Sequence, residues 1–314
     1  MKIAIDIASF CSTTTFGNYI VTENLIKAVQ AYDKKNSYYF YSFCQSPFPI
    51  KESKRFIYQN IQPKIFWSSI RTSVEELIKK KDYFFALNQS IPFFTKSKII
   101  SFSHGLSFYF YPHLYRDSYS QLKWQLDQMA SRSEKIIVSS EKVKKELVLV
   151  YQNIEAKIVV NPFGIPFDMI NGSEARSPKL EARNKFFLAV GMDHPIKNHK
   201  ILPKSKYKFI VVNNVSRTKL KSLYQKTTAL ITTSLYESFN LPVLEALAQG
   251  CPVIGLQSAI IPELEPYVNI VKDQNELPTL LDNAIQGRLK PVNVKEIRIK
   301  FSWKKYVNKL LKFL

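Results

Sequence analysis

The feature that most constrains the fold is an alternation of short apolar runs with helical segments, which occurs twice along the chain. In the first part, apolar runs rich in β-branched and aromatic residues lie at residues 2–7, 38–43, 83–87, 98–103, 135–138 and 157–160. Apolar residues recur with helical spacing at residues 19–32, 117–131 and 140–150. Strands that alternate with helices are typical of parallel sheets covered by helices, so this part predicts one α/β unit.

A polar stretch interrupts the alternation, and a second α/β pattern follows it. Residues 161–184 begin with Asn-Pro-Phe-Gly-Ile-Pro and contain Asn-Gly-Ser and Ser-Pro, a composition typical of a linker. The strands expected after it lie at residues 186–191, 208–213, 229–232, 252–255 and 268–272. The helices expected among them lie at residues 219–225, 241–249 and 276–286.

These patterns predict an α/β fold class with two Rossmann-like domains. We expect the domains at residues 1–165 and 185–297, a linker at 166–184, and an amphipathic closing helix at 298–314 that packs back toward the first domain. A length of 314 residues also favours two domains. Open α/β sheets bind ligands at the carboxyl ends of their strands, so the expected site is a cleft between the two domains.

The charge balance predicts an anionic partner. The chain has 45 Lys and Arg residues against 25 Asp and Glu residues, a net charge of +20. Residues 194–236 and the tail at 288–314 are both strongly basic, and the first of these contains no acid. Such a chain attracts nucleotides, phosphorylated ligands, nucleic acid or anionic lipid. The tail is better suited to an anionic membrane surface or a polyanionic acceptor, although its lysines equally suit a solvated helix face.

Cysteine usage and the N-terminus bear on location. Cys11, Cys44 and Cys251 are far apart and odd in number, so we expect neither a disulfide framework nor a metal cluster, and a reducing cytosol. Asp6 interrupts the short N-terminal apolar stretch, which favours a buried strand over a signal peptide. No stretch approaches the roughly 18 apolar residues of a membrane span. We therefore expect a soluble or peripheral protein.

The segment at residues 233–253 is the most informative for chemistry. It predicts a strand, a short loop, a helix with Asn240 as N-cap and Pro242 in its first turn, and another strand. The helix amides then lie just past a strand end, where a diphosphate binds. Glu237 in the loop and Glu245 in the helix suit hydrogen bonds to sugar hydroxyls. Taken singly, each acid also has a structural interpretation, as a solvated loop acid or a helix-dipole partner.

This segment resembles the signature of the retaining glycosyltransferases of family 4, which have the GT-B fold. Their pattern of Glu, seven residues and Glu stands here as Glu237-Ser-Phe-Asn-Leu-Pro-Val-Leu-Glu245-Ala. Further segments resemble the family in the same order along the chain: Thr15-Phe-Gly17-Asn-Tyr19, Ser103-His104-Gly105-Leu-Ser-Phe108, Val138-Ser139, Asn161-Pro-Phe-Gly164-Ile, Phe187-Leu-Ala-Val-Gly191 with Lys197-Asn198, Gly250-Cys-Pro-Val253 and Pro262-Glu263.

The resemblance implies an acceptor-side first domain, a nucleotide-sugar-binding second domain and three catalytic residues. Glu237 would contact hydroxyls of the donor sugar, Lys197 would neutralise the diphosphate, and His104 would face the reacting sugar unless it is a packed or N-capping histidine. The donor-binding set implied is Gly17, Lys197, Val215, Glu237, Ser238, Phe239, Asn240, Leu241 and Glu245, with Glu245 at the ribose, Gly17 in a loop that approaches the phosphate, and Val215 near the base.

The reaction implied is a retaining, metal-independent transfer of a sugar, a hexose being the favoured case, from a nucleotide-diphosphate sugar to a glycan, lipid-linked or protein acceptor. It needs no cofactor, and a phosphate oxygen takes the acceptor's proton. Preorganised donors at the leaving phosphate stabilise its charge. The implied setting is polysaccharide biosynthesis in the cytoplasm or at the inner membrane face. No nucleic-acid-binding motif is present, so nucleic acid is not an expected partner.

Three departures from the family favour an alternative, a non-catalytic subunit that binds a glycan or partners an active enzyme. Met192 stands where the family has an Arg, with Lys200, Arg217 and Lys219 as candidate substitutes. Gly105 replaces an acid. Only residues 199–214 separate Lys197-Asn198 from the next matching segment, so the second domain has lost about one βα unit. The presence of Lys197 and both motif glutamates favours the enzyme.

Overall fold

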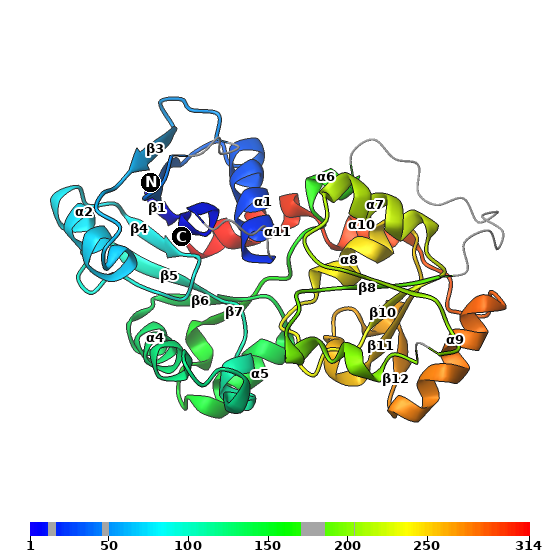
Figure 1. Ribbon diagram of the computed structural model, residues 1–314. Helices are drawn as coiled ribbons and strands as arrows, with labels where there is room; N and C mark the ends of the chain where they lie inside the picture. Colours follow the sequence, from blue (N-terminus) through cyan, green and yellow to red (C-terminus); the bar gives the residue numbers. More distant parts are fainter. Residues whose placement is uncertain (12–16, 46–49, 171–185, 204) are drawn as a thin grey trace. The chain divides into compact units, whose positions relative to one another are not determined.

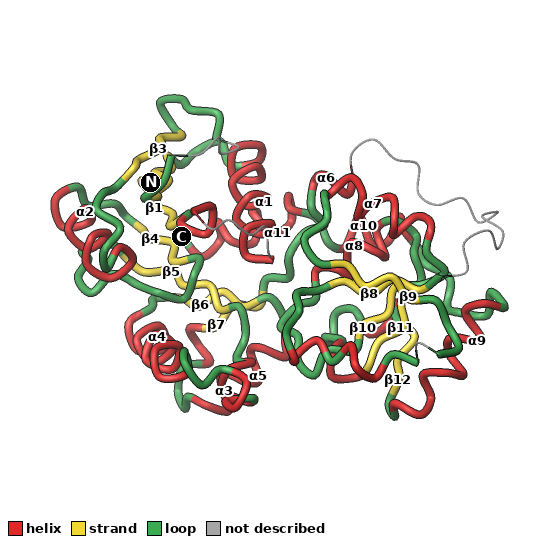
Figure 2. The backbone as a smooth tube through the Cα atoms, viewed as in Figure 1, coloured by secondary structure: helices red, strands yellow, loops and turns green. Residues whose placement is uncertain are grey.

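The computed structural model describes residues 1–11, 17–45, 50–170, 186–203 and 205–314, and the chain divides into two units (Figure 1). Unit 1 consists of Met1–Phe163 and Trp303–Leu314, and unit 2 consists of Gly164–Ser302. In each unit a layer of strands is flanked by helices (Figure 2). Part of the predicted linker, Phe167–Ile170, forms helix α6 of unit 2, and residues 171–184 lie outside the described residues.

Within the described residues, the unit 1 sheet has seven parallel strands in the order β3-β2-β1-β4-β5-β6-β7. The strands are β1 (Lys2–Asp6), β2 (Ser37–Ser42), β3 (Phe56–Asn60), β4 (Tyr83–Ala86), β5 (Lys98–Ser103), β6 (Lys135–Val138) and β7 (Ile158–Val160). The helices are α1 (Gly17–Tyr32), α2 (Thr72–Ile78), α3 (Ser107–Phe110), α4 (Tyr119–Arg132), α5 (Glu141–Val150) and α11 (Trp303–Leu310). Central strands buried on both faces require near-continuous apolar runs, as β4 and β5 have. The strand β3 and the helices α2 and α3 are additions to the predicted pattern.

The C-terminal helix belongs to unit 1 by its packing. Helix α11 lies against α1, and its buried side chains are Trp303, Tyr306, Val307 and Leu310. The Asn161 side-chain amide donates to the Tyr306 carbonyl at 3.1 Å, and the Tyr83 hydroxyl donates to the Leu314 carbonyl at 2.7 Å. The apolar side chains of the amphipathic tail are thus part of the unit 1 core.

The unit 2 sheet, within the described residues, has five parallel strands in the order β12-β11-β10-β8-β9. The strands are β8 (Phe187–Val190), β9 (Phe209–Val212), β10 (Leu230–Thr232), β11 (Val253–Leu256) and β12 (Asn269–Val271). The helices are α6, α7 (Arg217–Lys226), α8 (Leu241–Ala248), α9 (Leu277–Ile285) and α10 (Val294–Lys300). Helix α8 packs against β10 and β11 and is contacted by α6, α7 and α10. Helix α8 is thus enclosed between the sheet and three other helices.

The prediction that the cysteines form no disulfide is wrong for one pair. Cys11 and Cys44 are joined by a disulfide, with their Cα atoms 5.7 Å apart. Cys11 follows β1 and Cys44 follows β2, and these neighbouring parallel strands bring their carboxyl ends side by side. The pairing depends on strand order, so the spacing of the cysteines did not indicate it, and cysteine usage no longer supports a reducing compartment. Cys251 is a buried free thiol.

No helix among the described residues is long and apolar enough to cross a membrane.

Candidate functional site

The carboxyl edge of the unit 2 sheet brings two of the predicted catalytic residues together. Strands β8 and β10 are neighbours, and the loops that follow them carry Lys197 and Glu237. The Thr233 hydroxyl donates to the Lys197 carbonyl at 2.8 Å, which fastens one loop to the other. Lys197 Nζ lies 2.6 Å from Glu237 Oε1, with the two side chains 17% and 13% exposed. The result is a largely desolvated ion pair at the edge where ligands bind.

Gly191 is the residue that lets the Lys197 side chain reach this position. A Cβ at Gly191 would lie 3.1 Å from both Cδ and Cε of Lys197, so the lysine stem passes directly over the glycine. The next residue, Met192, is exposed and carries no charge. Of the predicted substitutes for the missing Arg, Lys200 and Lys219 are exposed.

The amino end of α8 has the predicted strand, loop and helix, but Asn240 does not cap it with its side chain. Asn240 has a left-handed backbone (φ 66°, ψ 68°), a conformation that asparagine tolerates better than most residues. Its side-chain amide instead donates to Thr232 Oγ1 at 3.0 Å and to the Ala259 carbonyl at 3.1 Å. These two bonds connect the left-handed turn to residues that follow β10 and β11. The first amides of a helix have no acceptor within it, so the positive end of α8 begins at Leu241.

Glu245 lies one helical turn further along and is almost fully buried, at 2% exposure. Its Oε1 accepts a hydrogen bond from Arg217 at 2.7 Å, and its Oε2 accepts one from the Tyr224 hydroxyl at 3.0 Å. Arg217 also donates to Asp168 at 2.6 Å. Burial raises the pKa of Glu245, and the positive charge of Arg217 opposes that rise. The geometry fixes both carboxylate oxygens in place.

Sequence reasoning did not find this network, although one signal pointed to it. Arg217 occupies the first position of α7, at the positive end of the helix dipole, where a cation is disfavoured unless it has an acidic partner. The sequence predicts Arg217 only as a substitute phosphate ligand. The structure instead places its guanidinium between Asp168 and Glu245. Asp168 and Tyr224 were not predicted at all.

The remaining predicted residues of unit 2 contribute differently. Phe239 is a core residue, 2% exposed, and its ring meets Phe301 edge-on at 6.4 Å. Ser238 and Leu241 are half-buried in the loop and first turn around it. Val215 is half-buried and directly precedes Ser216, the N-cap of α7. Phe239 therefore offers a ligand its backbone, while its side chain packs inward.

The predicted residues of unit 1 lie after β5 and at the start of α1. His104 Nε2 hydrogen-bonds to the Leu87 carbonyl, and because a carbonyl only accepts, Nε2 carries the proton. Burial lowers the pKa of His104, which favours a neutral ring with Nδ1 as an acceptor. Gly105 has a φ of 97°, so an acid at this position would be strained. Gly17 begins α1 with open space around its Cα, and residues 12–16 of the predicted loop lie outside the described residues.

An unpredicted carboxyl group, that of Asp6, lies at the same edge of unit 1. Asp6 ends β1, is 2% exposed, and accepts a hydrogen bond from the Ala8 amide at 2.8 Å. Asn88, which follows β4, donates to it at 3.5 Å. Burial raises the pKa of Asp6 to about 6. In the sequence, Asp6 indicates only that the N-terminal apolar stretch is a buried strand and not a signal peptide.

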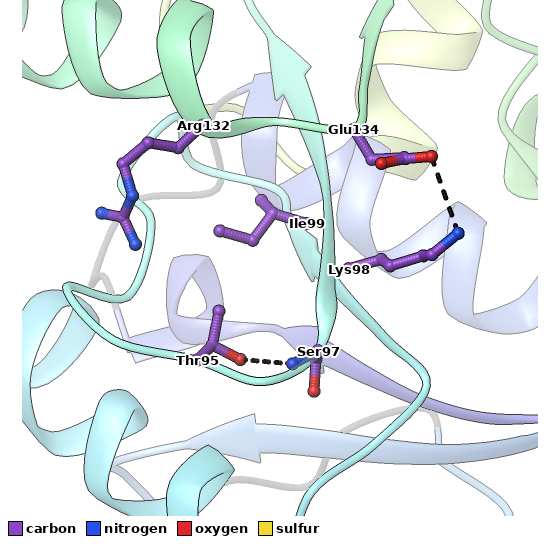
Figure 3. Close-up of a pocket in the computed structure, with 6 residues that line it drawn as sticks. All are labelled: Thr95, Ser97, Lys98, Ile99, Arg132 and Glu134. Carbon is purple, nitrogen blue, oxygen red and sulfur yellow. Dashed lines mark hydrogen bonds and ion pairs between the residues drawn. The ribbon is translucent and has the colours of Figure 1, made fainter.

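A surface pocket of about 340 Å³ lies at the opposite, amino end of β5 (Figure 3). It is lined by Thr95, Ser97, Lys98, Ile99, Arg132 and Glu134. Figure 3 shows Lys98 directed toward Glu134, and their charged atoms are 3.6 Å apart. None of the predicted site residues lines this pocket, so it is separate from the candidate site. Among the described residues, no cluster of three or more His, Cys, Asp or Glu side chains is placed to hold a metal ion.

Comparison with known sequences relates unit 2 to one group of enzymes. Residues 176–276, which include Lys197, Glu237 and Glu245, match the family model "Glycosyl transferases group 1". The O-antigen chain mannosyltransferase RfbU of Salmonella typhimurium is 26% identical over 178 residues, which cover 46% of this chain and 48% of RfbU. The match thus spans about half the length of that relative.

Comparison with solved structures concerns the fold. Sucrose-phosphate synthase of Thermosynechococcus elongatus superimposes with a TM-score of 0.73 at 15% identity. The superposition covers 99% of this chain and 98% of the synthase chain. HepE of Anabaena, in complex with UDP and glucose, gives a TM-score of 0.70 at 14% identity, with 100% of both chains covered. The predicted fold class, two Rossmann-like domains of the GT-B type with a C-terminal helix, is confirmed. The chain thus has a GT-B fold, and residues 176–276 of it are similar to glycosyl transferases group 1.

Proposed function

We propose that the protein is a retaining, metal-independent glycosyltransferase of family 4. It moves a sugar, a hexose in the favoured case, from a nucleotide-diphosphate sugar to a glycan, lipid-linked or protein acceptor, without a cofactor. The observation that carries the proposal is the ion pair of Lys197 and Glu237 at the carboxyl edge of the unit 2 sheet, inside the matched domain. Its cellular setting is the cytoplasm or the inner face of the membrane.

The chemistry of the pair suits a donor that is itself charged at one end. The diphosphate accepts hydrogen bonds from Lys197 Nζ and from the amides at the start of α8, and hydroxyls of the sugar donate to Glu237. Negative charge grows on the leaving phosphate in the transition state, so a fixed cation and helix end stabilise it more than they stabilise the bound donor. The phosphate then takes the acceptor's proton, and no side chain serves as a general base.

Two further groups support the proposal. The carboxylate of Glu245 has about four acceptor sites in all, and Arg217 and Tyr224 occupy one on each oxygen, which leaves capacity for two ribose hydroxyls. In unit 1, His104 has its proton on Nε2, so Nδ1 can accept a hydrogen bond from a sugar hydroxyl. Gly17 and Val215 are proposed to border the donor's phosphate and base.

The first experiment is donor binding followed by thermal unfolding. UDP-glucose, UDP-galactose and GDP-mannose are suitable probes, because HepE is solved with UDP and glucose and RfbU is a mannosyltransferase. A donor at about 100 times its Kd stabilises the fold by about 2.7 kcal/mol. We expect one donor to raise the Tm of the protein and of Lys200→Ala, but not of Lys197→Ala. If no sugar nucleotide binds or is hydrolysed, the proposal is wrong.

The alternative is a non-catalytic subunit, and the exposed Met192 in the place of a phosphate-binding Arg is the observation that favours it. Turnover distinguishes the two functions. An enzyme transfers or slowly hydrolyses its donor and loses that activity in Glu237→Ala. A subunit that binds a donor or glycan without any turnover, alone and with candidate acceptors, supports the alternative.

A further inference from the structure

Helix α2 of unit 1 is inverted: its apolar side chains face outward and its polar ones face inward. Ile70, in the π-helical turn at Trp67–Arg71 that leads into α2, is exposed together with Val74, Leu77 and Ile78. The spacing i, i+4, i+7 and i+8 places these four on one helical face. In α2 the buried residues are Thr72, Ser73, Glu75 and Glu76. A surface helix normally has the opposite arrangement.

Hydrogen bonds on the inner side fix this orientation. Glu76 accepts a hydrogen bond from the Tyr41 hydroxyl at 2.8 Å and one from Ser97, and it lies 3.9 Å from buried Lys81. The Phe94 amide donates to Ser73 Oγ at 3.1 Å. Rolling the helix would break these buried bonds and leave the carboxylate unpaired, which is strongly unfavourable. The apolar face is therefore held toward the outside.

Neighbouring residues widen the apolar surface. Ile65, Phe66 and Phe94 are 72%, 69% and 67% exposed. Phe66 also has a left-handed backbone (φ 48°), an uncommon conformation for a bulky side chain. The bond from the Phe94 amide to Ser73 fixes Phe94 beside α2. We call this surface the α2 face; it consists of Ile65, Phe66, Ile70, Val74, Leu77, Ile78 and Phe94.

Positive charge borders the α2 face. Lys64, Lys79, Lys80 and Lys96 are all exposed. Residues 61–81 are all described, and the two acids among them, Glu75 and Glu76, are both buried. The next residue, Asp82, is an exposed acid, so lysines outnumber exposed acids here by four to one. Exposed apolar side chains bordered by lysines are typical of helices that lie in the interface of anionic lipid, whereas the core of a protein interface is depleted of lysine.

We propose that the α2 face docks unit 1 onto an anionic lipid bilayer, with its apolar side chains at the acyl boundary and its lysines at the phosphates. The basic tail is a weaker candidate, since the apolar side of α11 is buried in unit 1 and presents charge alone. The inference rests on unit 1 contacts only and does not depend on the proposed sugar transfer.

The test uses co-sedimentation with vesicles of phosphatidylcholine, alone or mixed with phosphatidylglycerol. We expect the full chain to bind the mixed vesicles and the double variant Leu77→Ser with Ile78→Ser to bind at least about tenfold more weakly, because two partly inserted side chains are lost. The matched control is Leu149→Ser, which removes another exposed leucine (76%) from α5 and is expected to bind normally.

Charge variants separate this surface from the tail. Lys80→Glu with Lys96→Glu is expected to weaken binding to the mixed vesicles, and Lys304→Glu with Lys309→Glu on α11 to leave it nearly unchanged. A loss in the tail variant only would overturn the proposal. A wild-type chain that does not bind the mixed vesicles would also overturn it. If that chain forms a dimer that Leu77→Ser with Ile78→Ser disrupts, the α2 face binds a second copy of the chain instead.

Two readouts keep a negative result interpretable. The Tm of each variant should match that of the wild type, because all substituted side chains are exposed. Vesicle binding needs no sugar nucleotide, so its failure leaves the transferase proposal standing, and a failure of donor binding leaves the α2 face standing. Binding should also fall with added salt, in proportion to the lysine contribution.

Discussion

At the carboxyl edge of the unit 2 sheet, polar side chains are held by ion pairs, whereas at the same edge of unit 1 the described residues hold them by hydrogen bonds to neutral groups. Unit 2 pairs Lys197 with Glu237 and Arg217 with Glu245. Among the described residues of unit 1, Asp6 accepts hydrogen bonds from two amides, and burial disfavours the charge of both Asp6 and His104. Both edges are formed by the carboxyl ends of parallel strands, but their electrostatics differ.

Under the proposed function, the difference indicates that the two edges bind different parts of the substrates. A diphosphate brings charge that must be neutralised, so its edge needs cations and helix amides. A sugar or acceptor brings hydroxyls, and groups that accept hydrogen bonds without strong fields suit it.

Lys197→Ala should have the largest effect, because it removes the cation that faces the leaving phosphate. We expect kcat to fall by about 10²–10³-fold, as for the loss of one preorganised donor in other enzymes. The measurement is the rate of donor hydrolysis or transfer, with exposed Lys200→Ala as the control at near wild-type rate. Equal rates in the two variants would contradict a catalytic role for the unit 2 ion pair.

Arg217→Ala should destabilise unit 2 by about 3 kcal/mol, since it leaves Glu245 buried without its cation. The double variant Arg217→Ala with Glu245→Gln should recover most of this loss, because a neutral amide needs no counter-charge. Urea unfolding at pH 7.5 measures both. A double variant no more stable than the single one would show that Arg217 acts through Asp168 instead.

Asp6→Asn should stabilise unit 1 at neutral pH. The pKa of Asp6 is raised from 3.8 to about 6, so between these values the unfolded chain releases a proton that the folded chain keeps. Stability therefore falls as the pH rises through this window, by at most about 3 kcal/mol. We expect Asp6→Asn to raise the free energy of unfolding at pH 7.5 and to lose this advantage below about pH 4. A destabilised variant at pH 7.5 would mean that the ionised carboxylate is needed in the fold.

Gly191→Ala should have the smallest effect, a several-fold rise in the KM for the donor. The new methyl group meets the lysine stem at 3.1 Å, so Nζ must shift by a few tenths of an ångström while keeping its charge. Steady-state kinetics measure KM and kcat, and Gly287→Ala is unsuitable as a control because its φ is 70°. Gly17→Ala is the variant in unit 1 to compare with Gly191→Ala, because its added methyl group meets open space.

Local pattern predicted much of the fold. Strands β5 and β6 begin and end at the predicted residues, because buried parallel strands are continuous apolar runs. Strand β3 was missed because only Phe56 of it is buried, at the sheet edge, and no such run marks it. Helix α2 was missed because it is short and its polar residues, not its apolar ones, face the core.

The candidate site divides in the same way. The residue types, spacing and helix signals of the segment around Glu237 and Glu245 were readable in the sequence. The partners were not: Lys197 lies 40 positions from Glu237, and Arg217 lies 28 positions from Glu245. These contacts form only because β8, β9 and β10 are adjacent in an order that differs from their order along the chain.

The sequence by itself therefore determined the two α/β units, the strand-loop-helix of the candidate site and the positions of its charged residues. Such features depend on the periodicity and conformational preference of contiguous residues. Tertiary structure alone decided the Cys11–Cys44 bond, the partner of Glu245 and the outward direction of the α2 face. A helical pattern states which residues share a face, but only packing against the rest of the chain decides whether that face turns inward or outward.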